Sequence, residues 1–520
     1  MAERVRKAAD RFDQTRLRNR AALAFALGSA AVLSLPPFSV LLLLPLSFGG
    51  LVLLLRGTSL RISLITGWSF GFGFFLFGIS WIAESFFIDA ERFGWMAIPA
   101  VVGLSAFLAM FAAIPCGIYS RFKVFGVSAS FVFALSWTGF EWLRGHIFTG
   151  FPWNLIGYVW ADYAAPRQAA ALVGSYGLSL LTMMLALLPA TLVFARTCRE
   201  RRIAALLFVS LACVLWSGGW LRLSFQTEVA SKFTVRIVQG NIPQADKWSP
   251  ALRDSIFNRY LILSAGPGSY DILVWPEAAF PGHLDENLAA LGRIGDLLPP
   301  ESYLLAGTPQ RVNVGSALEY RNTTLAIDDE GTVTGFYAKH HLVPFGEYVP
   351  WRRWLPIERL APNVADFSPG SGPSTVSLGP SLPAAGMTIC YEAIFPGEII
   401  DRQNRPAWIF NATNDAWFGQ SLGPWQHFAS ARMRAVEEGL PMVRAANTGI
   451  SAVIDPYGNL RARIALGVTG IADVALPPPL VSPPYALYGD LMLLPLLLAA
   501  VILAWSLRPK AGRGERRNPT

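Results

Sequence analysis

Long apolar runs alternate with short polar segments through the first 225 residues, and a further run lies near the end of the chain. A helix rises 1.5 Å per residue, so about 20 apolar residues cross the ~30 Å core of a bilayer. The pattern predicts eight membrane spans, at 21–35, 38–55, 62–83, 95–120, 125–143, 169–195, 203–222 and 486–507. The first two are short and are separated only by Leu35-Pro36-Pro37, so a broken hairpin that does not fully cross is an alternative.

Basic residues occur in every second segment between these runs. They cluster before the first run, between the second and third, the fourth and fifth, and the sixth and seventh, and after the eighth. An excess of Lys and Arg marks the cytoplasmic loops of membrane proteins. The alternation therefore predicts that both termini are cytoplasmic and that the long segment between the seventh and eighth spans lies on the opposite side.

That long segment, roughly residues 228–480, has a different pattern. Short apolar stretches bounded by Gly, Pro and Asn are typical of buried strands. They occur at 233–239, 270–275, 303–307, 323–328, 333–338, 386–390, 408–412, 442–446 and 451–455. Helical patterns lie at 250–264, 286–298 and 425–438. We expect a soluble α/β or layered α+β domain of about 250 residues.

The composition agrees with this division. Of the 520 residues, 53% are hydrophobic and 15% charged, which excludes a disordered chain and is too apolar for an ordinary soluble enzyme. The net charge of +8 arises from loop residues, so nucleic acid is not an expected partner. We expect a membrane domain of about seven helices at 1–225, the soluble domain at 228–480, a C-terminal span at 485–507 and a basic cytoplasmic tail at 508–520.

Three reactive side chains each follow a predicted strand of the soluble domain: Glu277, Lys339 and Cys390. A carboxylate can take the proton of a thiol, and an ammonium group can stabilise a developing oxyanion. A free Cys has a pKa of about 8.5, so it needs such help near neutral pH. Taken singly, a Cys at a strand end is more often a small buried hydrophobe; the combination predicts a nucleophilic site.

Metal and disulfide chemistry are not expected. The four cysteines lie far apart, and the five histidines lack the spacing of a metal site. We therefore expect no metal and no cofactor.

The residues around the three candidates carry a resemblance. Trp275-Pro276-Glu277, the segment from Lys339 to Glu347 that ends in Leu-Val-Pro-Phe-Gly-Glu, and Cys390-Tyr391-Glu392 resemble the carbon-nitrogen hydrolase (nitrilase) superfamily. With the predicted spans, the whole chain resembles its integral-membrane branch, the bacterial apolipoprotein N-acyltransferases. The resemblance implies an α-β-β-α sandwich on an eight-helix membrane base.

The resemblance also implies residue roles. Glu277 matches the general base, Lys339 the residue that stabilises the tetrahedral intermediate, and Cys390 the nucleophile that becomes a thioester. Glu347 matches a second carboxylate that holds the lysine. Residues expected to bind substrate or belong to lids are Trp153, Trp248, Asn322, Tyr391, Glu392 and Trp417. The loops around Trp248 and at 345–366 are the expected lids.

The implied reaction is a ping-pong acyl transfer. An acyl chain passes from a membrane phospholipid, with phosphatidylethanolamine the expected donor, to Cys390. It then passes to the N-terminal amine of S-diacylglyceryl-cysteine on an apolipoprotein, which completes lipoprotein maturation. The implied location is the bacterial inner membrane, with the catalytic domain in the periplasm.

Two alternatives keep parts of this interpretation. A membrane-anchored amidase or nitrilase would use the same triad on small amides, although one anchor would then suffice. A transporter or sensor would use the soluble domain as a binding module, but the full triad and the scarcity of ionisable residues within the spans argue against it.

Overall fold

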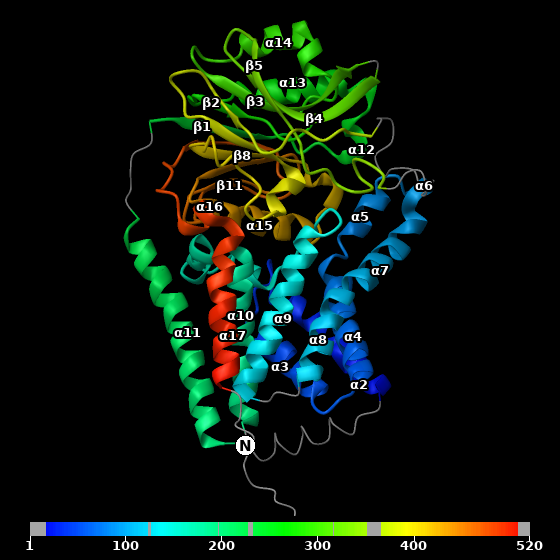
Figure 1. Cartoon of the computed structure of the whole chain (residues 1–520). Helices are drawn as coiled ribbons and strands as arrows, with labels where there is room; N and C mark the ends of the chain where they lie inside the picture. The colour runs from blue at the N-terminus through cyan, green and yellow to red at the C-terminus, as the bar shows by residue number, and fades with distance from the viewer. Residues whose placement is uncertain are drawn as a thin grey trace, which may run out of the picture.

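The computed structural model describes residues 17–122, 126–195, 197–226, 232–315, 317–350 and 366–507. Most of the basic N-terminal cluster, the tail at 508–520 and most of the expected lid at 345–366 lie outside these ranges. In the described part, one half of the molecule is helical and the other consists of two stacked sheets with flanking helices (Figure 1).

The helical half is built from the N-terminal segment and the C-terminal end of the chain. Its α-helices are α2 (Leu17–Val32), α3 (Leu43–Leu55), α4 (Leu60–Gly78), α5 (Ile82–Phe87), α6 (Ala90–Phe93), α7 (Ala97–Leu108), α8 (Met110–Phe122), α9 (Gly126–His146), α10 (Ala170–Phe194), α11 (Cys198–Ser224), α16 (Pro484–Tyr488) and α17 (Leu493–Ser506). Among the described residues, five helical stretches are long and apolar enough to cross a membrane: Leu60–Gly78, Ala90–Phe122, Pro166–Phe194, Cys198–Ser224 and Pro484–Ser506.

These five stretches correspond to the third, fourth, sixth, seventh and eighth predicted spans. The fifth is α9, which has 21 residues but includes Glu141 and several Ser and Thr residues, so it is less apolar. The first two are α2 and α3, whose described parts have 16 and 13 residues and fall short of the ~20 that a span needs. The structure supports a membrane domain with five candidate spans, and the count of eight stays a prediction.

Two six-stranded sheets make up the other half. The first has the strand order β12-β1-β2-β3-β4-β5 and the second β11-β10-β9-β8-β7-β6. The first sheet contains β1 (Thr234–Gln239), β2 (Ile272–Val274), β3 (Tyr303–Val314), β4 (Ala317–Ile327), β5 (Val333–Ala338) and β12 (Gly470–Ala475). The second contains β6 (Thr375–Val376), β7 (Ala385–Ile389), β8 (Trp408–Thr413), β9 (Met442–Ala446), β10 (Ser451–Ile454) and β11 (Leu460–Ile464). In each sheet three neighbouring strands, β1 to β3 and β7 to β9, run parallel.

The sheets stack through a shared apolar layer that includes Val235 and Ile272 of one sheet and Met387 and Phe410 of the other. Helices α13 (Arg253–Ser264) and α14 (Leu288–Gly295) cover the outer face of the first sheet, and α15 (Gly423–Glu438) covers the outer face of the second. The prediction of a layered α/β domain is confirmed.

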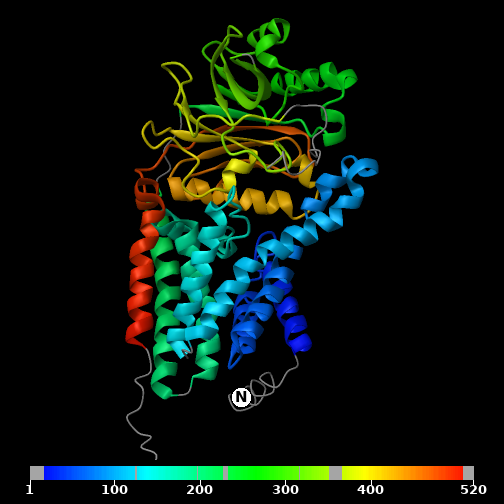
Figure 2. The same ribbon diagram turned by 45° about the vertical axis from the view of Figure 1, so that its right-hand side comes forward.

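Helix α15 joins the two halves of the molecule. It lies between the second sheet and the membrane helices, where Figure 2 shows it in orange. Phe428 packs towards the sheet, and Met433 packs towards the helical bundle. Arg434 of α15 donates a hydrogen bond to Ser175 of α10 over 2.8 Å. Because α15 packs in both cores, it holds the second sheet directly on the membrane domain.

Candidate active site

Glu277 lies just beyond the carboxyl end of the parallel strand β2. Trp275 and Pro276 lead the chain from the strand into a turn that passes close to β3. Gly307 makes this approach possible, because a Cβ atom there would lie 2.6 Å from the Cα atom of Glu277. The Glu277 side chain is buried, and its Oε1 accepts a hydrogen bond from Asn322 Nδ2 over 2.7 Å.

Lys339 follows the last residue of β5 and is only 1% exposed. Its Nζ atom lies 2.8 Å from Oε2 of Glu347 and 4.0 Å from Oε1 of Glu277. Burial by itself lowers the pKa of a lysine, but Glu347, Glu277 and Cys390 outweigh it and raise the pKa of Lys339 above its usual value. The neighbouring carboxylates therefore favour the charged ammonium form of the side chain.

Cys390 begins the short helix that follows β7, with φ at +50°. This left-handed conformation is unfavourable for a residue with a Cβ atom, so neighbouring contacts must hold it. Burial, and then the carboxylate of Glu277, raise the pKa of the thiol well above its usual range, while Lys339 opposes them. The resting nucleophile is thus a neutral thiol that needs a base.

Asn322 of β4 connects the two carboxylates around the lysine. Its Nδ2 donates to Oε1 of Glu277 over 2.7 Å and to Oε1 of Glu347 over 2.8 Å, which uses both amide hydrogens. The backbone N–H of Val343 donates to Oε2 of Glu347 over 2.7 Å. The arrangement holds two carboxylates against one ammonium group, so one carboxylate can accept the thiol proton.

The two residues after the nucleophile connect it to other segments. Glu392 accepts hydrogen bonds from the backbone N–H groups of His340 and His341 over 2.8 and 3.1 Å, and its other oxygen accepts from Ile389 over 2.7 Å. It therefore joins the loop that carries Lys339 to the end of β7, the strand that precedes Cys390. The hydroxyl of Tyr391 donates to the carbonyl of Gly150, in a loop of the membrane domain, over 3.1 Å.

Lys247 is a charged neighbour that the sequence analysis missed. It is almost fully buried, and its Nζ donates to the backbone carbonyl of Glu277 over 2.8 Å. Burial lowers the pKa of this lysine to about 8, although the charges of Glu277 and Cys390 oppose the shift. Only the folded chain brings it to Glu277, 30 residues away, so no local pattern distinguished it from a solvated lysine.

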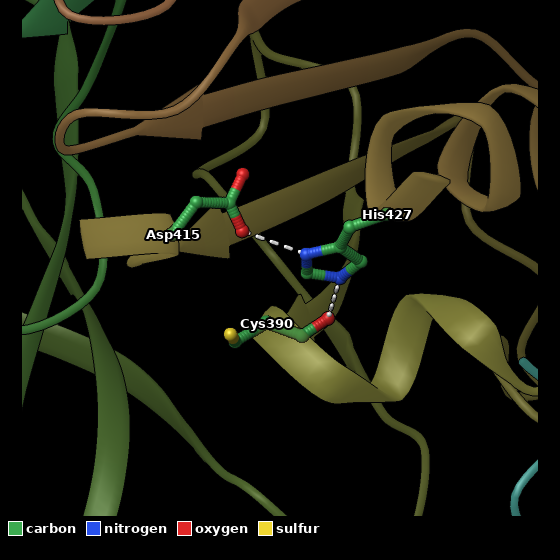
Figure 3. Close-up of side chains that lie close together, drawn as sticks. All are labelled: Cys390, Asp415 and His427. Carbon is green, nitrogen blue, oxygen red and sulfur yellow. Dashed lines mark hydrogen bonds and ion pairs between the residues drawn. The ribbon is translucent and has the colours of Figure 1, made fainter. Parts of the chain in front are cut away.

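His427 of α15 was also missed. Its Nε2 donates to the carbonyl of Cys390 over 2.9 Å, and its Nδ1 lies 2.7 Å from Oδ1 of Asp415 (Figure 3). The thiol of Cys390 points away from the ring in this view. Arg444 pairs with the other oxygen of Asp415 over 2.8 Å.

These three residue types could in principle hold a metal, since one ligand atom from each of Cys390, Asp415 and His427 lies within 4.8 Å of the others. Both nitrogens of His427 are, however, within hydrogen-bond distance of oxygen atoms. Arg444 brings a positive charge to the same carboxylate. The arrangement therefore fits a hydrogen-bond network that positions the backbone of Cys390 better than it fits a metal centre.

The three tryptophans of the expected access or lid regions lie in different environments. Trp153 is buried, with its ring centroid 4.5 Å from Trp81 and 5.7 Å from His427, and its Nε1 donates to Gln426 over 2.7 Å. In this structure Trp153 therefore packs against His427, the residue that bonds the backbone of Cys390. Trp248 is 38% exposed, and Trp417 is half-buried.

Known proteins resemble both halves of the chain. The sequence profile of the apolipoprotein N-acyltransferase N-terminal domain matches residues 27–188, and that of carbon-nitrogen hydrolases matches residues 234–483. A protein from Rhodopseudomonas palustris named apolipoprotein N-acyltransferase is 38% identical over 510 residues, which cover 93% of this chain and 95% of that one. A protein of the same name from Bradyrhizobium diazoefficiens is 39% identical over 509 residues, which cover 93% and 94%. Among solved structures, the amidase from Nesterenkonia sp. AN1 matches 52% of this chain and 99% of its own, with 17% identity and a TM-score of 0.35.

Proposed function

The chain belongs to the apolipoprotein N-acyltransferase family of carbon-nitrogen hydrolases, and from this premise we propose that it completes lipoprotein maturation by acyl transfer through Cys390. One observation carries the assignment of residues. The Lys339 ammonium lies between the carboxylates of Glu277 and Glu347. The charges of Lys339 and Glu277 both act on the buried thiol of Cys390. Such a site can form and resolve a thioester without a metal.

The first half-reaction acylates the enzyme. Glu277 takes the proton of the Cys390 thiol, and the sulfur attacks an ester carbonyl of a phospholipid. Lys339 stabilises the oxyanion of the tetrahedral intermediate. When the intermediate collapses, the ester C–O bond breaks, Glu277 returns the proton to the departing oxygen, and a lysophospholipid leaves.

The second half-reaction transfers the acyl chain to an amine. The N-terminal amine of a diacylglyceryl-cysteine attacks the thioester carbonyl and loses a proton to Glu277. The C–S bond then breaks, and the sulfur recovers the proton as a thiol. Glu347 keeps Lys339 in place through both half-reactions, because the two side chains form an ion pair. Asn322 keeps the base in place, because it donates hydrogen bonds to both Glu277 and Glu347.

The membrane domain is consistent with this substrate. Removing a sixteen-carbon chain from the bilayer costs about 10 kcal/mol at ~0.8 kcal/mol per CH₂. A site in a domain that rests directly on membrane helices can take the acyl chain without that cost. The proposed topology is eight spans with both termini in the cytoplasm and the catalytic domain in the periplasm of a bacterial inner membrane, and the proposed donor is phosphatidylethanolamine.

The test is a transfer assay with purified protein, a phospholipid labelled in one acyl chain and a diacylglyceryl-cysteine peptide. We expect the label to appear as an amide on the peptide with wild-type protein and not with Cys390→Ala. Release of ammonia from small amides, with phospholipid untouched, would instead favour the amidase alternative.

A further inference from the structure

Helix α12 (Gln244–Lys247) is a single turn that contacts the surroundings of both the base and the nucleophile. At its last residue, Nζ of Lys247 donates to the backbone carbonyl of Glu277 over 2.8 Å. At its first residue, Oε1 of Gln244 accepts a hydrogen bond from Nδ2 of Asn414 over 2.7 Å. Both of these helix residues are buried. The two ends of one helical turn are thus bonded to two different segments of the active site.

Asn414 lies beside the sulfur of Cys390. The two residues follow the ends of β8 and β7, which pair in parallel, so they leave the sheet at the same edge. A carboxylate oxygen of Asp415, the next residue, lies within 4.8 Å of the sulfur. Burial and the charges of Glu277 and Asp415 raise the pKa of the thiol, whereas the charge of Lys339 and a hydrogen bond from the backbone N–H of Asn414 lower it. Asn414 therefore contacts the reacting atom through its backbone.

Two amide side chains hold the side chain of Asn414. Its Nδ2 donates to Gln244, and its Oδ1 accepts a hydrogen bond from Nδ2 of Asn447 over 3.1 Å. Asn447 is itself fixed, because its side chain exchanges two hydrogen bonds of 2.9 and 2.8 Å with the backbone of Ile242. Its backbone N–H also donates to the carbonyl of Thr413 over 3.1 Å. The Asn414 amide is therefore held at both its oxygen and its nitrogen.

We propose that Gln244 is a positioning residue for acyl transfer, which holds Asn414 against the sulfur of Cys390 from the same helical turn that places Lys247 on the backbone of the base. A hydrogen bond weakens steeply when its donor is misaligned, so the orientation of Asn414 controls how well its N–H stabilises the thiolate. The bond between Gln244 and Asn414 joins two side chains, so it can be removed without changing a backbone hydrogen bond. This inference rests on the proposed function and adds a positioning residue to it.

The first experiment measures single-turnover thioester formation with vesicles of phosphatidylethanolamine. Gln244→Met keeps the length of the side chain but replaces the amide by a thioether, which is only a weak acceptor. We expect the rate constant at saturation to fall about tenfold and the half-saturating amount of lipid to stay the same. The matched control is Gln310→Met in β3, which removes a 3.0 Å hydrogen bond to Asp285 and should leave the rate unchanged. Equal rates for Gln244→Met and wild type would overturn the proposal.

A double-variant comparison tests whether Gln244 acts through Asn414. Asn414→Leu removes the same hydrogen bond from its other side. The protein with both Gln244→Met and Asn414→Leu should therefore react no more slowly than Asn414→Leu alone. If the two effects multiply instead, Gln244 acts by another route and the proposal is overturned.

A measurement without lipid separates this proposal from the proposed function. Iodoacetamide reacts with the thiolate, so its rate of reaction with Cys390, followed by mass spectrometry, reports how well the thiolate is stabilised. We expect Gln244→Met to react severalfold more slowly than wild type at pH 7. An unchanged rate together with a lower midpoint of thermal unfolding would show that Gln244 only supports the fold, which overturns the proposal alone. Failure of wild-type protein to form a thioester from any phospholipid would overturn the proposed function, whereas slower alkylation of Gln244→Met would still support the positioning role.

Discussion

His427 donates a hydrogen bond from Nε2 to the carbonyl oxygen of Cys390 over 2.9 Å. Cys390 has a left-handed backbone, which costs about 1–3 kcal/mol for a residue other than glycine. The bond is one of the contacts that hold this conformation, and Asp415 orients the ring that makes it. His427 is therefore a positioning residue that acts through the backbone of the nucleophile.

Removal of this hydrogen bond should slow acylation. We predict that His427→Ala lowers the rate of thioester formation by about tenfold to a hundredfold, the effect of losing 1.4 to 3 kcal/mol of positioning. The half-saturating phospholipid concentration should stay the same, because the ring is fully buried and contacts the backbone of Cys390 rather than the surface of the site. His427→Gln, which keeps a side-chain N–H, should recover part of the rate. Equal rates for His427→Ala and wild type would contradict the positioning role.

Loss of the general base Glu277 should slow thioester formation more than loss of His427. Glu277→Gln retains the shape of the side chain but removes the acceptor for the thiol proton. Since the buried thiol has a raised pKa, few molecules would ionise unaided. We predict that thioester formation falls by about a hundredfold to ten-thousandfold, as for other general bases. Rapid single-turnover kinetics measure this, and a fall of less than tenfold would show that another group takes the proton.

The pH profile should report Lys247. Its pKa is lowered to about 8, so it is cationic below this pH and becomes neutral as the pH rises through it. A cation near Cys390 favours the thiolate, so acylation should lose rate above pH 8. Lys247→Met should be slower at pH 7 and lack this decline, and Lys247→Arg should keep its rate to higher pH. Identical alkaline declines in all three proteins would exclude Lys247 as the cause.

The turn that carries Glu277 should tolerate no side chain at Gly307. A methyl group there would overlap the Glu277 backbone, and overpacking of this kind costs about 1–3 kcal/mol. We predict that Gly307→Ala lowers the midpoint of thermal unfolding and the acylation rate together. The control is Gly292→Ala in α14, where a Cβ atom meets nothing within 4 Å. That change should leave activity intact and raise the midpoint slightly, because alanine favours a helix.

Much of the α/β domain could be predicted from local patterns because its central strands are continuously apolar. The predicted strands at 333–338 and 442–446 have the same bounds in the structure. The strands β11 and β12 were missed because they lie at sheet edges and mix partly buried residues with exposed ones such as Arg461 and Arg463. Strand β3 continues to Val314 in a half-exposed hairpin that an apolar run does not reveal.

Some residues of the site could likewise be predicted from the sequence, and others could not. Glu277, Lys339 and Cys390 could be proposed because each follows an apolar strand, and the structure brings the lysine and carboxylates together. Lys247 and His427 could not be proposed, since their partners lie 30 and 37 residues away and only the tertiary structure joins them. The environment of Trp153 depends on the contact between the two halves of the molecule, which no local pattern encodes.

The central claim is that Cys390 carries the acyl chain as a thioester. The most direct measurement is the intact mass of purified protein after incubation with phosphatidylethanolamine in the absence of an acceptor. We predict one added acyl chain on the wild type, removed by hydroxylamine, lost on addition of a diacylglyceryl-cysteine peptide and absent from Cys390→Ala. An unmodified wild-type protein that still acylates the peptide, or an adduct that persists in Cys390→Ala, would contradict the account.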